Sequence, residues 1–257
     1  MFCRTVAALA VCLLTGLPVL AAEESDLGIT LDTTVVSRYM WRGFDVLGDK
    51  AAFQPSVNWD VPGTGLSLNV WGSFGLGNNC DDLNELDYSA AYGYSFFAEE
   101  RYQVDATLTY IYYHYPRLDL SNVQEVDLGF EMPNLIPVGD SNLVPSYTAA
   151  KVWADHSDTP GVAGWFHIFG LAYDLSVSCP IRDGVKQPIE LTAEVVYNDG
   201  AFGVDEDWSH VQFGLALPVE LGMFTLTPAV TCQRTFEETV NPERNEVWGS
   251  LGLSCEF

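Results

Sequence analysis

Apolar and polar residues alternate along most of the chain. In residues 53–61, for example, Phe53, Val57 and Trp59 alternate with polar side chains. A period of two is typical of β-strands that have one apolar and one polar face. The pattern predicts strands at 27–35, 53–61, 66–71, 86–96, 102–112, 125–132, 143–154, 165–177, 189–197, 210–219, 224–231 and 247–257. Residues 143–154 fit least well, because small residues occupy the apolar side.

The connections between these segments alternate in length. Short, turn-like connections lie near 62–65, 98–101, 135–142, 179–187 and 220–223. Longer, polar and acidic connections lie near 43–51, 77–84, 115–123, 155–164, 199–208 and 235–245. Short periplasmic turns opposite long extracellular loops are typical of outer-membrane barrels. We therefore expect an all-β fold, a transmembrane antiparallel up-and-down β-barrel of about 12 strands.

The first residues have the form of an export signal. Arg4 precedes a short apolar run at 6–14, and small residues near Ala21 and Ala22 offer a cleavage site. We expect residues 1–22 to be a signal peptide and residues 23–257 to be one barrel domain in the cell outer membrane of a Gram-negative bacterium. No segment beyond the signal is long and apolar enough for a helical span.

A soluble β-sandwich or lipocalin-like barrel is the alternative, because its strands also alternate. Charged residues are scarce on the apolar side of the predicted strands, which favours a lipid-facing surface. Aromatic residues also gather near strand ends, as the interfacial belts of a membrane barrel require. They include Trp41, Tyr110, Tyr112, Trp165 and Tyr197.

The last strand has a specific form. Ser250, Gly252, Cys255 and Phe257 occupy the places of the C-terminal signal by which outer-membrane barrels are recognised for assembly. We therefore expect the barrel-assembly machinery, outer-membrane lipid and lipopolysaccharide as partners. With Phe257 on the lipid side, Ser250 and Gly252 face inward.

A local resemblance covers residues 30–75. The segment Ser37-Arg38-Tyr39-Met40-Trp41-Arg42-Gly43, followed by Gln54 and the residues 68–73, resembles the opening of the TorF-family porins. The resemblance implies an outer-membrane barrel and a channel. It implies no catalytic residues.

The chain is strongly acidic, and its charge narrows the possible partners. Beyond residue 22 it carries 35 acidic and 10 basic residues, a net charge of −25. Nucleic acid is not expected as a partner, because phosphate binding needs a basic face. The apolar content, 48% of residues, does not fit a disordered chain.

Polar positions of the strands predict the lumen of the barrel. The inward candidates are Asp32, Arg38, Arg42, Asp60, Asp105, Glu125, Asp127, Glu131, Lys151, Asp174, Glu190 and Glu194. Fixed carboxylates raise the local concentration of cations. We expect a porin-like channel for passive diffusion of small hydrophilic solutes, with a preference for cations. The alternative is a closed structural or surface-interaction barrel, because small barrels often fill with side chains.

Two arginines stand out among these candidates. Arg38 and Arg42 are four residues apart, which predicts that they share one face of the first strand. Opposite Glu125 and Asp127 they would form a constriction, although structural pairing is the simpler interpretation.

The sequence offers few candidates for metal binding, catalysis or disulfide bonds. Acidic loop clusters such as Asp82 with Glu85 match no calcium-loop pattern and are expected to be solvated charge. Asp155-His156 and Asp207 near His210 are the only candidates for catalysis, and no nucleophile is evident beside them. We expect no enzyme, no metal and no cofactor. The widely spaced Cys80, Cys179, Cys232 and Cys255 reveal no disulfide pairing.

Overall fold

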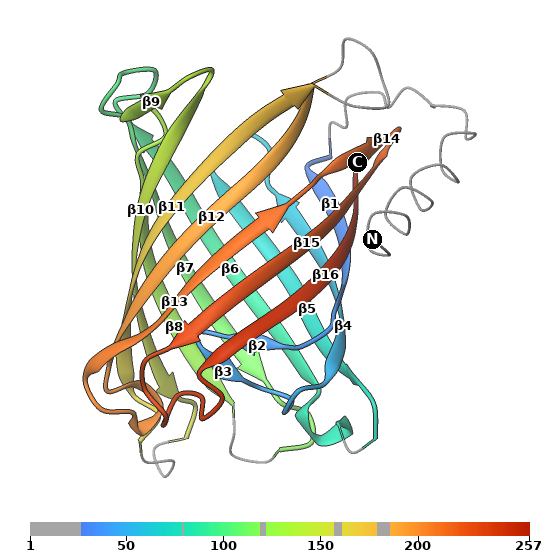
Figure 1. The fold of residues 1–257 in the computed structure, drawn as a ribbon, viewed down its shortest axis with the longest axis vertical. Coiled ribbons are helices and arrows are strands. Elements are labelled where there is room, and N and C mark those ends of the chain that lie inside the picture. The colour runs from blue at the N-terminus through green and yellow to red at the C-terminus, as the bar shows by residue number, and fades with distance from the viewer. Residues whose placement is uncertain (1–26, 79, 119–121, 157–160, 179–185) are drawn as a thin grey trace, which may run out of the picture.

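The computed structural model describes residues 27–78, 80–118, 122–156, 161–178 and 186–257, and these residues form a closed antiparallel barrel of 12 strands (Figure 1). Each wall strand pairs with its neighbours along the chain, and β1 pairs with β16 to close the wall. The wall strands are β1 (Ile29–Val36), β4 (Ala51–Asp60), β5 (Leu66–Leu76), β6 (Glu85–Phe96), β7 (Val104–His114), β8 (Val123–Glu131), β10 (Ser141–Ala154), β11 (Gly164–Ser178), β12 (Lys186–Asp199), β13 (Asp207–Ala216), β15 (Phe224–Thr235) and β16 (Asn245–Glu256). The predicted barrel of about 12 strands is confirmed.

The seam between the first and last strands leaves no free edge. Leu31 lies opposite Cys255, and Thr34 lies opposite Gly252. Beyond the last strand, the Phe257 amide donates to the Ile29 carbonyl at 2.8 Å. Closure matters because unpaired backbone groups cannot be satisfied in hydrocarbon.

Side chains alternate between an outer face and a lumen face. The outer face carries large exposed apolar side chains, among them Val247 at 68% and Phe213 at 54% exposed. A continuous exposed apolar surface of this kind marks contact with lipid or another apolar partner. In the described residues, no helix has the length and apolarity needed to cross a membrane.

Aromatic side chains form two groups on the outer face, one toward each end of the barrel. Near one end Tyr197 packs edge-on to Trp208, with ring centroids 5.6 Å apart. Near the other end Tyr94 packs edge-on to Phe96 at 4.9 Å. Two such belts are the arrangement that a barrel spanning a bilayer requires.

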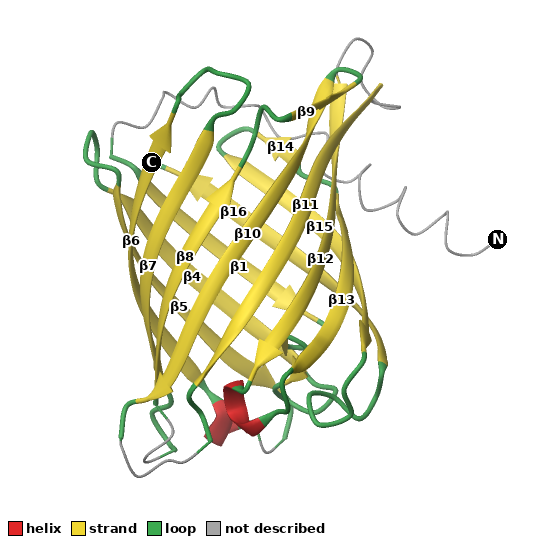
Figure 2. Ribbon diagram, turned by 90° about the vertical axis from the view of Figure 1, so that its left-hand side faces the viewer, coloured by secondary structure: helices red, strands yellow, loops and turns green. Residues whose placement is uncertain are grey.

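The two ends of the barrel differ (Figure 2). We call the end with the β1–β4, β5–β6 and β12–β13 connections the loop end, and the opposite end, which holds Phe257, the turn end. Short extensions β9 (Ile136–Val138) and β14 (Val219–Leu221) lie at the turn end. Two 3-10 turns, η1 (Asp81–Leu83) and η2 (Ala201–Gly203), lie at the loop end.

Candidate functional site

The chain leaves the wall after Val36 and folds into the barrel. There β2 (Met40–Trp41) and β3 (Phe44–Asp45) form a small hairpin inside the loop end (Figure 1). Its turn is made by Arg42 and Gly43, whose φ angles are 46° and 94°. A two-residue turn with both φ angles positive is the type I′ pattern, which favours glycine. We call residues 38–47 the plug hairpin.

The prediction that Arg38 and Arg42 share one face of the first strand is therefore wrong. The strand ends at Val36, and the positive φ of Arg42 belongs to a turn. Both arginines still lie inside the barrel, because the hairpin carries them there.

Trp41 anchors the plug hairpin in an aromatic core. Its ring centroid lies 5.8 Å from that of Tyr113, 5.8 Å from that of Phe166 and 5.5 Å from that of Phe202, each edge-on. Such pairs contribute about 0.5–1.5 kcal/mol beyond their burial. Trp41 was predicted in the outer aromatic belt, and that prediction is wrong because the hairpin turns inward.

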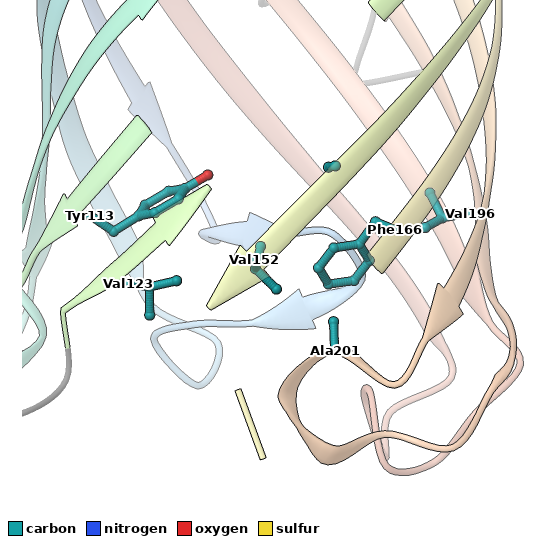
Figure 3. Close-up of a cluster of buried hydrophobic side chains, with 7 residues drawn as sticks. Tyr113, Val123, Val152, Phe166, Val196 and Ala201 are labelled. Atoms are coloured by element: carbon teal, nitrogen blue, oxygen red, sulfur yellow. The ribbon is translucent and has the colours of Figure 1, made fainter. Parts of the chain in front are cut away.

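The wall supplies the rest of this core from lumen-facing positions. Figure 3 shows these side chains gathered around the hairpin. Val152, Phe166 and Val196 are completely buried although they point into the barrel. The hairpin thus fills the lumen at the loop end and packs there against an apolar cluster of the wall.

Arg42 pairs with the acids that the sequence placed opposite it. Its Nη2 lies 2.5 Å from Glu125 Oε1 and 3.7 Å from Asp127 Oδ2. Its guanidinium also stacks at 4.8 Å from the ring centroid of Phe166. Because Glu125 is fully buried, this pair contributes to holding the hairpin: a buried charge left without its partner is strongly destabilising.

Two further contacts hold the other parts of the hairpin. Arg38 forms ion pairs with Asp49 and with Glu246, which is 3% exposed. The Gln233 side-chain amide donates to the Gly43 carbonyl at 3.0 Å. The hairpin is therefore tied to β8 and, across the lumen, to the adjacent strands β15 and β16.

Glu85 was expected to be solvated loop charge, and the structure instead buries it. It accepts hydrogen bonds from the hydroxyls of Tyr39 at 2.9 Å and Tyr115 at 2.7 Å, and it is 1% exposed. Burial, and then the Glu85 carboxylate, raise the pKa of Tyr39 well above its usual range. The same two causes raise the pKa of Tyr115. Both tyrosines therefore stay protonated as donors. Alternation alone did not reveal Glu85, because its partners come from two loops.

The acids of the turn-end half remain open to the lumen. Strand register places the following predicted residues on the lumen face: Asp32, Asp60, Asp105, Glu131, Asp174 and Glu190. Asp105 lies directly opposite Glu131, and Asp174 lies directly opposite Glu190. Among the described residues none of these four forms an ion pair, although Gln103 donates to Asp105 at 2.9 Å. Like charges placed opposite one another repel, and a mobile cation between them relieves that repulsion.

Glu194 also faces the lumen, closer to the plug hairpin. Its Oε1 accepts a hydrogen bond from Gln212 at 3.2 Å and lies 3.8 Å from His210 Nε2.

Lys151 does not line the lumen, contrary to prediction. It lies opposite Val126 and Trp165, whereas its neighbours Ala150 and Val152 share the lumen face with Asp127 and Glu125. Its ammonium group lies 5.1 Å from the ring centroid of Trp165 on the outer face. The prediction failed because the core packed against the hairpin makes the lumen side of this strand apolar.

Ser209 and His210 form a contact that sequence reasoning missed. Val196 pairs with His210 and Tyr197 pairs with Trp208, so Ser209 is bulged out of the ladder. The bulge brings Ser209 Oγ to 3.0 Å from His210 Nδ1. Both side chains are fully buried, so neither is within reach of a solute in this structure.

The remaining predictions concern the ends of the chain and its cysteines. Ser250 and Gly252 face the lumen and Cys255 the outer face, as expected, while recognition by the assembly machinery stays a prediction. Cys80, Cys232 and Cys255 are free thiols. The signal peptide and Cys179 lie outside the described residues.

No family model and no curated protein matches the chain. The resemblance to the TorF-family porins thus stays a prediction. Solved structures do match. The structure described as the KdgM porin in complex with disordered oligogalacturonate has a TM-score of 0.52 at 10% identity, over 89% of this chain and 99% of that chain. LpxR from Salmonella typhimurium has a TM-score of 0.53 at 8% identity, over 89% and 100%. At such identities the likeness is one of fold, and the fold is that of 12-stranded outer-membrane β-barrels.

Proposed function

We propose that the protein is a porin-like outer-membrane channel for passive diffusion of small hydrophilic solutes, with a preference for cations. The observation that best supports this proposal is the negative charge of the lumen. Its turn-end half presents acids such as Asp105, Glu131, Asp174 and Glu190, which have no basic partner among the described residues. Fixed carboxylates in a confined space concentrate cations and repel anions.

The plug hairpin sets the narrow part of the proposed path. Arg38 and Arg42 are its positive groups, and both are paired with acids, so they leave the potential of the lumen negative. Solutes would pass between the hairpin and the wall, which limits them to small hydrated species. Export through residues 1–22, membership of the TorF family, and contacts with lipopolysaccharide and the assembly machinery belong to the same proposal.

Conductance in planar bilayers tests this function. Purified protein in a potassium chloride gradient is expected to give small channels whose reversal potential shows preference for potassium. A reversal potential of the opposite sign would contradict the preference for cations. Absence of conductance, both in the wild type and in a variant whose residues 39–46 are replaced by a short Gly-Ser linker, would contradict the channel itself.

A closed barrel is the second candidate, and the core around Trp41 favours it. Fully buried Phe166 and Val152 show that the loop end is packed like a protein interior. Such a barrel would act through its acidic loops as a structural or surface-interaction protein. Liposome swelling separates the two candidates, since a closed barrel passes no solute. Neither candidate assigns catalysis to the chain.

A further inference from the structure

A cavity of about 410 Å³ lies beside the plug hairpin, on the lumen face of the wall. Aromatic rings from both sides line it: Tyr39 and Trp41 from the hairpin, and Trp71, Tyr113 and Trp248 from the wall. Tyr39 and Trp71 are in contact, with ring centroids 5.8 Å apart. The volume falls in the range of small-molecule sites.

One carboxylate stands in the middle of this aromatic surface. Strand register places Asp87 directly between Trp71 on β5 and Tyr113 on β7, all on the lumen face. Its Oδ1 is buried and has no hydrogen-bond partner. The neighbouring acid Glu85 is fully engaged by two tyrosine hydroxyls. Asp87 is therefore the acid at this site with unused capacity to accept a hydrogen bond.

The two arginines of the plug hairpin form ion pairs with acids other than Asp87. Arg38 also lines the cavity, but it pairs with Asp49 and Glu246. Arg42 pairs with Glu125. A buried carboxylate without a partner is costly, and an incoming cation that donates a hydrogen bond removes that cost.

We propose that this cavity binds a small organic ammonium ion with an apolar body. The ammonium group donates to Asp87 Oδ1, and the apolar body packs on the rings of Trp71 and Tyr113, whose faces also attract positive charge. A metal ion fits less well. Among the described residues the one group of three acids spaced to hold a metal is Asp49, Glu243 and Glu246, and it does not include Asp87. A neutral sugar would leave the carboxylate uncompensated.

This inference rests on the proposed function only in that a solute must enter the lumen. Binding is measured on folded protein in detergent and needs no conduction, so the two proposals fail separately. Isothermal titration compares phenethylammonium with phenethyl alcohol, which has a similar shape without the charge. The wild type is expected to bind the ammonium ion and to bind the alcohol at least about tenfold more weakly.

Two variants and a control complete the test. Asp87→Asn keeps the shape and removes the charge, so affinity for phenethylammonium is expected to fall about tenfold. Trp71→Leu removes one of the rings and is expected to weaken binding of phenethylammonium. This variant tests the site independently of whether Asp87→Asn folds. Glu220→Gln, at an exposed acid of β14 outside the cavity, is expected to leave affinity unchanged. Equal losses in the Asp87 and Glu220 variants, or equal binding of the alcohol, would overturn the proposal.

Discussion

At the scale of single residues, Arg42 has the most buried partner of any cation in the barrel interior that the structure describes. Its partner Glu125 is fully buried, so Arg42→Met would leave a carboxylate in a packed core without its counter-ion. We expect this variant to lower the free energy of unfolding by about 3–5 kcal/mol. Urea unfolding of the protein in lipid vesicles, followed by tryptophan fluorescence, measures the loss.

The double variant Arg42→Met with Glu125→Gln is expected to recover part of that loss, because no uncompensated charge remains. Arg244→Met is the matched control. Its pair with Glu238 spans 2.6 Å, but the two side chains are 46% and 71% exposed. Such surface pairs contribute about 1 kcal/mol or less. A loss as large in Arg244→Met as in Arg42→Met would contradict the role of burial.

At the scale of elements, the plug hairpin depends on a close approach at Gly43. A Cβ atom there would lie 2.7 Å from His210 Nδ1 and 2.8 Å from Val240 Cγ1. Gly43→Ala is therefore expected to displace the hairpin, destabilise the protein by about 1–3 kcal/mol and increase conductance. Single-channel recording and urea unfolding measure these effects.

Gly48 provides the matched control, because a substitution there causes backbone strain without a steric contact. Its φ is also positive, at 60°, but no atom lies within 4 Å of a Cβ placed there. Gly48→Ala is expected to show the backbone penalty alone, about 1 kcal/mol, with unchanged conductance. If both variants conduct alike, the hairpin does not set the narrow part of the path.

The same element shows where prediction from sequence succeeds and where it stops. Alternation identified the wall strands because each wall residue meets either the outside or the lumen. It failed after Val36, because an inserted hairpin is defined by contacts with β7, β8 and β11, which are distant in sequence. Lys151 was misplaced for the same reason. Apolar Val152 faces inward only because the hairpin covers it.

At the scale of the whole molecule, charge is divided between the two ends of the lumen. At the loop end Arg38 and Arg42 of the hairpin pair with Glu246 and Glu125, whereas at the turn end Asp174 and Glu190 face each other without a basic partner among the described residues. In the proposed channel, a solute arriving from the turn end would meet a negative vestibule before the packed plug hairpin. Under that proposal, selectivity depends on the turn-end half and conductance depends on the hairpin.

This division gives a prediction for selectivity. The variant Asp174→Asn with Glu190→Gln is expected to move the reversal potential in a potassium chloride gradient toward zero, because two lumen charges are lost. It is also expected to be up to about 1 kcal/mol more stable, since opposed like charges are removed. Lys151→Glu is the control. It makes the net charge more negative by two, but on the outer face, where it should leave the reversal potential unchanged. A shift in the control as large as that in the double variant would show that overall charge, rather than the charge of the lumen, determines which ions pass.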